Sequence, residues 1–311
     1  MELDLGKAFV DGSKLFWLAT QREDKELAHV SDLSGMCDRL AHARRSGKNM
    51  AIPDHQSITA MSLGLHLEGY ILDRIEAGLP NEWAMERDLV VVIKRDPSTG
   101  RLVGFHQTRA QFDKFVLPQF DATTRVKGHI DAALVNTTTR QVIIIDTKTK
   151  AWSRGWSGDS NRQEFRADSD FRDNYVVQVG TYGVGFDGAK HGALFEFNKA
   201  GSEFRTGWID LQEVLPLVEQ RFAEVIARSN PSNPEPEIGP LEWTKVKSGE
   251  SWACGYLTMI GSAKSGKRGM QKISKGYCEY HECPNHIVSR VRALAETAKF
   301  PGDKILAGEV F

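Results

Sequence analysis

The sequence predicts an α/β or α+β protein with a mixed central β-sheet flanked by helices. Short segments rich in Val, Ile and Leu are interspersed with longer segments whose apolar residues recur at helical spacing. In chain order they read as helices, a hairpin, a strand pair, a helix and a strand, which is typical of such a sheet. A chain of 311 residues, 41% hydrophobic and 26% charged, is long and apolar enough to bury this core.

The first half of the chain carries two predicted helices. Residues 29–47 begin at a polar N-cap, either Ser31 or Asp32, and end near Gly47. Residues 57–78 place apolar side chains near one helical face and also end at a glycine.

Two strand pairs and further elements follow. Residues 88–94 and 101–106 surround the turn sequence DPSTG and are expected to form a hairpin. Residues 125–135 and 141–147 surround NTTTR in the same way. The remaining predicted elements are a helix in 171–187, a strand at 192–198 and an amphipathic helix at 210–228.

Proline content predicts how the chain is divided. Residues 229–240, SNPSNPEPEIGP, are expected to form a semi-rigid linker. The linker would separate a core of residues 1–228 from a cysteine-containing C-terminal segment of residues 241–311.

Charge and hydropathy narrow the function classes. The formal net charge is −1, so nucleic acid could be bound only through a local basic surface. No signal peptide and no run of about 20 apolar residues is visible, so we expect a cytoplasmic protein without a membrane partner. In a reducing compartment the four cysteines are expected to be metal ligands or free thiols rather than disulfides.

The sequence QVIIIDTKTK places ionisable residues at the end of a buried strand. Residues 142–145 are apolar on both faces, whereas Asp146 and Lys148 point to one face, because strand side chains alternate. A short antiparallel connection would bring Asp131 of the preceding strand beside Asp146. Paired carboxylates persist most easily around a cation, and their oxygens suit Mg²⁺ or Mn²⁺. The alternative is an Asp–Lys ion pair at a solvated strand end.

These residues resemble a known nuclease family in both order and spacing. The pattern is similar to the RecB-like branch of the PD-(D/E)xK nuclease superfamily, over roughly residues 29–290, and it implies a restriction-endonuclease-like sheet. One departure is that Asp rather than Glu precedes the motif lysine. The matching residues are Gly64 and His66, Gly128-x-x-Asp131, Asp146-Thr147-Lys148 and Gln178-x-x-x-Tyr182.

The resemblance also implies roles for the matching residues. His66, Asp131, Asp146 and the backbone carbonyl of Thr147 would bind Mg²⁺ or Mn²⁺, and Lys148 would serve the attacking water. Gln178 and Tyr182, one helical turn apart, would orient the lysine and the DNA backbone. Taken alone, His66 could equally be an ordinary core histidine.

The cysteines resemble those of a smaller subgroup. Cys37 precedes the nuclease motifs, and Cys254, Cys278 and Cys283 follow them. This arrangement is similar to RecB-like nucleases that hold a [4Fe–4S] cluster, including CRISPR-associated exonucleases and phage proteins. The resemblance implies that the cluster joins the C-terminal segment to Cys37. The late cysteines are more widely spaced than usual. Because His281 lies between two of them, a Cys₃His zinc site is one alternative, and unrelated thiols are another.

Two further segments are candidate DNA contacts. Residues 262–276 are basic and rich in glycine and serine, so they could grip phosphates or simply aid solubility. Tryptophans and arginines interleave just after Lys148 and could contact single-stranded DNA, or could cover the end of the sheet. They are Trp152, Arg154, Trp156, Arg162 and Arg166.

The predicted function is that of a metal-dependent DNA exonuclease, acting on single-stranded DNA or DNA ends in recombination, repair or phage DNA processing. One alternative is a structure- or sequence-specific endonuclease on the same core. A second alternative is an adaptor that binds DNA without cutting it.

Overall fold

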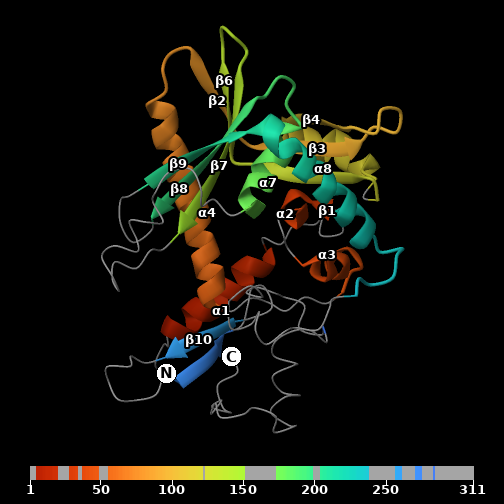
Figure 1. Cartoon of the computed structure of the whole chain (residues 1–311). Coiled ribbons are helices and arrows are strands. Elements are labelled where there is room, and N and C mark those ends of the chain that lie inside the picture. Colours follow the sequence, from red (N-terminus) through yellow and green to blue (C-terminus); the bar gives the residue numbers. More distant parts are fainter. Residues whose placement is uncertain are drawn as a thin grey trace.

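Two mixed β-sheets form the centre of the protein, as seen in a computed structural model of the chain (Figure 1). The structure describes residues 5–19, 28–33, 37–48, 55–121, 123–150, 173–198, 204–237, 256–260, 270–274 and 283. The predicted α+β class with helices flanking mixed sheets is confirmed.

The first sheet has the strand order β1-β5-β3-β4. The short strand β1 pairs parallel to β5, and the other neighbours pair antiparallel. The predicted hairpin is present, and Asp96 in its turn accepts hydrogen bonds from Ser98 and Thr99. The strands are β1 (Ala28–His29), β3 (Leu89–Arg95), β4 (Leu102–Thr108) and β5 (Arg125–Ile130).

The second sheet has the order β2-β6-β7-β8-β9, and it carries the motif strand β7 at its centre. In this sheet only β7 and β8 pair in parallel. Residues 142–147 form a continuous buried run, because both faces of β7 belong to hydrophobic clusters. The strands are β2 (Trp83–Glu86), β6 (Ala132–Asn136), β7 (Val142–Lys150), β8 (His191–Asn198) and β9 (Phe204–Asp210).

The two sheets meet at Asp131, which lies in a bend between β5 and β6. The sequence predicts a single strand over residues 125–135, whereas the structure divides it between two sheets. The bend leaves Asp131 outside both ladders, and its carboxylate turns to Thr147 of β7.

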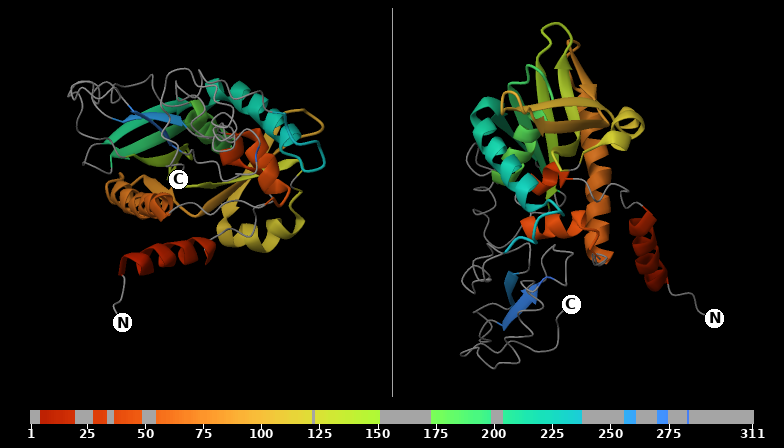
Figure 2. Two further views of the ribbon diagram at one scale, coloured as in Figure 1. Left: turned by 90° about the horizontal axis from the view of Figure 1, so that it is seen from below. Right: turned by 90° about the vertical axis from the view of Figure 1, so that its right-hand side faces the viewer.

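Helices cover both sides of the second sheet (Figure 2). Leu72 of α4 packs on Ile143 and Ile145 of β7, whereas α7 and α8 pack on the opposite side around Ile144 and Leu194. The longer helices are α1 (Leu5–Ala19), α3 (Asp38–Arg45), α4 (His55–Ala77), α7 (Asp173–Gly183) and α8 (Leu211–Arg228).

Shorter helices complete the described elements. The π-helix η1 places Phe112 and Val116 over the outer face of the first sheet, against Val90 and Val92. These elements are α2 (Val30–Leu33), α5 (Arg109–Gln111), η1 (Phe112–Val116) and the 3₁₀-helix η2 (Leu117–Gln119).

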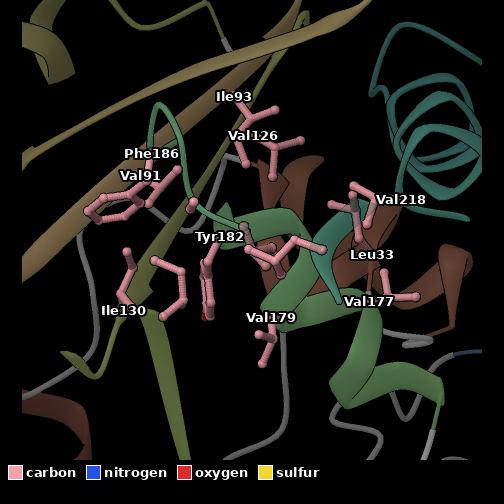
Figure 3. Close-up of a cluster of buried hydrophobic side chains, with 14 of the residues drawn as sticks. Leu33, Val91, Ile93, Val126, Ile130, Val177, Val179, Tyr182, Phe186 and Val218 are labelled. Carbon is pink, nitrogen blue, oxygen red and sulfur yellow. The ribbon is translucent and has the colours of Figure 1, made fainter. Parts of the chain in front are cut away.

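The main hydrophobic core joins the two sheets to α7 and α8 (Figure 3). Val91 and Val126 from the first sheet and Tyr182 and Val218 from the helices belong to one buried cluster. Gly128 lies at a close approach in this core, where an added Cβ would come within 2.5 Å of Val30 and 2.6 Å of Tyr182. The motif glycine is therefore required by packing.

The segment before α4 differs from the sequence prediction. Instead of one helix over residues 29–47, the chain forms β1, then α2, and then α3 with Cys37 as its N-cap. Asp32 accepts a hydrogen bond from the backbone N–H of His29, the last residue of β1. This local bond stabilises the change from strand to helix at the start of α2. Cys37 is thus held at a helix start and not within a helix.

The predicted Pro-rich linker is bound to α3 over its described part. Arg45 donates to Ser229 Oγ at 2.6 Å, the ring Nε2 of His42 lies 3.0 Å from the Asn233 carbonyl, and Arg39 donates to Glu235 at 2.7 Å. Residues 229–237 therefore run along α3 towards the N-cap residue Cys37.

The C-terminal segment contributes an antiparallel hairpin of β10 (Tyr256–Ile260) and β11 (Met270–Ser274). Among the residues that the structure describes, no helix combines the length and apolar character needed to cross a bilayer.

Candidate active site

The end of β7 carries Asp146 and Lys148 on one face of the second sheet. Asp146 is buried, with 1% of its side chain exposed, and Lys148 Nζ lies 2.5 Å from Asp146 Oδ2. Because side chains alternate along a strand, residues 146 and 148 share the face that packs against α7. The predicted juxtaposition of acid and lysine is present.

The carboxylate of Asp146 is only partly compensated within the part of the chain described. Both oxygens are buried, Lys148 forms an ion pair with Oδ2, and Oδ1 has no partner in that part. A buried, unsatisfied carboxylate is costly unless a further charge compensates it. The donor set therefore fits a cation with oxygen ligands.

Asp131 reaches the same strand end from the bend between the sheets. Its Oδ2 accepts hydrogen bonds from the Thr147 backbone N–H at 2.6 Å and from Thr147 Oγ1 at 2.8 Å. The ladder of β6 and β7 ends with Ala132 opposite Ile145, and Asp131, one residue earlier, lies close enough for its charge to act on Asp146. Both hydrogen bonds end on Oδ2, which leaves Oδ1 as the oxygen that could reach a cation.

The charges at this strand end act strongly on one another. Burial raises the pKa of Asp146 far above its ordinary value, with Lys148 opposing the rise and Asp131 adding to it. Burial lowers the pKa of Lys148, but the Asp146 and Asp131 carboxylates raise it by more, so the net pKa lies above its ordinary value. Lys148 is therefore an ammonium in the metal-free protein.

Glu68 of α4 belongs to this group of charges, although the sequence analysis did not single it out. Burial raises the pKa of Glu68 to about 7, Asp131 and Asp146 raise it further, and Lys148 lowers it. One signal was available in the sequence. Glu68 lies one turn before Ile71 and Leu72, so it interrupts the apolar stripe that faces the sheets.

His66 lies on a different side of α4 from Glu68. At about 100° per residue, two residues turn the helix by about 200°, and the His66 side chain is exposed to solvent. Within the described residues, no three His, Cys, Asp or Glu side chains come close enough together to form a metal-binding group. The structure thus places Asp131 near Asp146, whereas the His66 side chain is exposed on a different side of α4 from Glu68.

Helix α7 supplies three polar aromatic or amide side chains along one face. The ring of Tyr175 lies 5.2 Å from Lys148 Nζ, an arrangement that attracts the ammonium to the ring face. Gln178 Nε2 donates to Tyr182 Oη at 2.8 Å, and the Tyr182 ring is part of the core. The sequence analysis singled out Gln178 and Tyr182 but not Tyr175, which is the α7 residue with a described contact to Lys148.

Two of the four cysteines are described, and both lie at the same place. Cys37, at the start of α3, packs against a buried cluster of Leu40, Ala43 and Cys283. No disulfide joins these two described cysteines. Cys283 of the C-terminal segment therefore lies close to Cys37.

The other predicted ligands and contacts lie outside the described residues. They comprise Cys254, Cys278 and His281, the Trp–Arg segment after residue 150, and the basic residues 262–276 apart from those in β11.

Comparisons with known proteins assign no family to the chain. A scan against protein-family models and a search of curated proteins both give no match. Among solved structures, the chain is similar to the crystal structure of SSO0001, with a TM-score of 0.37 and 13% sequence identity, over 72% of this chain and 88% of that chain.

Proposed function

We propose that this protein is a metal-dependent DNA exonuclease that hydrolyses phosphodiester bonds. The observation that carries the proposal is the buried Asp146 carboxylate, whose Oδ1 has no partner among the described residues and whose neighbours are Lys148 and Asp131. An ordinary structural ion pair would be expected to have its carboxylate oxygens satisfied. The resemblance to RecB-like PD-(D/E)xK nucleases supports DNA as the substrate.

Asp131 and Asp146 would hold the divalent ion, with the Thr147 carbonyl added by resemblance, and Glu68 of α4 would add negative charge nearby. Carboxylate oxygens suit Mg²⁺ or Mn²⁺, and when bound such an ion stabilises negative charge on a scissile phosphate. The hydrogen bonds from Thr147 fix the Asp131 side chain, so one oxygen is held while the other stays available. The positive charge of a bound ion would also offset the repulsion between the charged Glu68 and Asp146.

Lys148 acts as a donor in this proposal. Its pKa is raised in the metal-free protein, so its ammonium would orient a water molecule or a phosphate oxygen rather than remove a proton. The Asp146 carboxylate keeps the ammonium at the strand end, 2.5 Å away. Positioned donors that face developing negative charge are a large source of rate enhancement.

We further propose a [4Fe–4S] cluster on Cys37, Cys254, Cys278 and Cys283. Support comes from the packing of Cys37 against the cluster that contains Cys283, and from residues 229–237, which run along α3 towards Cys37. Four thiolates are a complete ligand set for such a cluster. Iron analysis and visible absorbance of anaerobically purified protein test this, because zinc without iron would favour a Cys₃His site.

Matched linear and circular substrates test the exonuclease proposal. End-labelled linear DNA and circular single-stranded DNA are incubated with Mn²⁺ and the purified full chain. An exonuclease degrades the linear DNA and leaves the circle intact, whereas cleavage of the circle indicates an endonuclease on the same core. Metal-independent DNA binding without cleavage of either substrate would contradict the nuclease proposal and favour a DNA-binding adaptor.

A further inference from the structure

The ring of Tyr175 faces the ammonium of Lys148 across the gap between α7 and β7. Its centroid lies 5.2 Å from Lys148 Nζ. The Tyr175 side chain is half-buried and packs against the main core, so α7 holds the ring in place. The contact joins two elements that come from different parts of the sequence.

A carboxylate lies on another side of the same ammonium. Asp146 Oδ2 is 2.5 Å from Lys148 Nζ. This acid attracts the ammonium towards the strands, and the Tyr175 ring attracts it from the helix side.

We propose that Tyr175 is a positioning residue for Lys148, a role that rests on the proposed nuclease function. An ammonium has three N–H donors, and each carboxylate contact draws one of them towards the sheet. A ring face attracts the charge without accepting a directed hydrogen bond, so it can hold the ammonium while donors stay free for water or a phosphate oxygen. Tyr175 thereby keeps Lys148 at the position that the reaction needs.

Other side chains of α7 do not provide this contact in the described part of the helix. Gln178 donates to Tyr182, and Tyr182 is buried in the core against Gly128. These two residues fix the helix against the first sheet, whereas Tyr175, about two turns earlier along one face, reaches the second sheet at Lys148.

Two substitutions separate a ring-based role from simple packing. Tyr175→Phe keeps the ring and removes the hydroxyl, whereas Tyr175→Leu keeps apolar packing and removes the ring. We expect Tyr175→Leu to lower kcat for Mn²⁺-dependent cleavage by about threefold to thirtyfold, the range that corresponds to one cation–π contact, with KM unchanged. Tyr175→Phe should stay within about twofold of the parent protein by the same reasoning.

Tyr70 offers a matched control, because its exposed ring lies 5.1 Å from Arg74 on α4. Tyr70→Leu removes a comparable contact away from Lys148 and should leave kcat unchanged. Loss of activity in Tyr175→Phe equal to that in Tyr175→Leu would overturn the ring-based role. Full activity in a folded Tyr175→Leu variant would overturn the inference altogether.

Nuclear magnetic resonance gives a readout that needs no activity. The ε-methylene protons of Lys148, assigned with a Lys148→Arg variant, should be shifted upfield by the Tyr175 ring in the parent protein. The shift should persist in Tyr175→Phe, and its absence from the parent protein overturns the inference even if Tyr175→Leu fails to fold. A shifted Lys148 signal in a protein without nuclease activity would contradict the proposed function and leave the contact intact.

Discussion

Asp131 accepts two hydrogen bonds from Thr147, one from its backbone N–H and one from its hydroxyl. Thr147 lies on β7, whereas Asp131 lies in the bend between β5 and β6, where the second sheet begins. Thr147 is therefore the group that fixes the Asp131 carboxylate beside Asp146.

Removing the Thr147 hydroxyl should loosen Asp131. We expect Thr147→Val, which preserves shape and strand propensity, to lower the free energy of unfolding by about 1.5 to 3 kcal/mol, the usual contribution of a hydrogen bond to a charged group. Thr149→Val, on the same face two residues later, serves as the control and should cost less. Urea denaturation measures both, and equal losses would contradict the assigned role of the hydroxyl.

Substitutions of Glu68 and His66 should affect metal binding differently. Glu68→Gln should weaken Mn²⁺ binding by at least about tenfold, since even residues that only orient metal ligands contribute that much. His66→Gln should leave binding unchanged, because the His66 side chain is exposed on another side of α4. Isothermal titration calorimetry distinguishes them, and the reverse pattern would restore His66 as the α4 ligand.

The buried acids predict a pH dependence of stability in the metal-free protein. Folding raises the pKa of Glu68 from an ordinary 4.5 to about 7. A group whose pKa is raised by folding contributes stability below its unfolded pKa, and the contribution is lost as pH rises through the folded pKa. The stability of the parent protein relative to Glu68→Gln should therefore fall between about pH 4.5 and pH 7.

Chemical denaturation at several pH values, with a chelator present, measures this difference. Glu86→Gln, at an exposed position of β2, is the control and should show a smaller trend. A difference between parent and Glu68→Gln that is constant with pH would contradict the burial of Glu68 among the other acids.

Gly128 should tolerate no side chain. An added Cβ would lie 2.5 Å from Val30 and 2.6 Å from Tyr182, so Gly128→Ala is expected to lower the free energy of unfolding by about 1 to 3 kcal/mol. Gly69, in α4, has nothing within 4 Å of an added Cβ. Gly69→Ala should accordingly stabilise the protein by about 0.5 to 1 kcal/mol. The midpoint temperature of thermal unfolding should therefore fall for Gly128→Ala and rise for Gly69→Ala.

Strong local patterns predicted the parts of the fold nearest the candidate site. The apolar run into Asp146 and the short connection before it fixed both the interior strand β7 and its antiparallel partner β6. The hairpin of β3 and β4 followed from its turn residues. The Asp131–Asp146 neighbourhood was predictable because side-chain alternation and a short turn leave few other registers.

Features that depend on distant contacts were not predictable in this way. The division into two sheets results from the bend at Asp131, which leaves no mark in a strand-like sequence. Tyr175 and Glu68 reach Lys148 and the acids only after α7 and α4 pack on opposite sides of β7. The segment 229–237 looked like a spacer because its hydrogen bonds are made with α3, far away in sequence.

The central claim is that Lys148 and the neighbouring acids form a hydrolytic site. Cleavage of end-labelled linear DNA by the Lys148→Met variant, compared with the parent protein at equal Mn²⁺ concentration, tests it most directly. The parent protein and a Lys94→Met control, altered at an exposed position of β3, are predicted to cut the DNA, whereas Lys148→Met is predicted to lose nearly all activity. Cleavage by Lys148→Met at the rate of the parent protein would contradict the account.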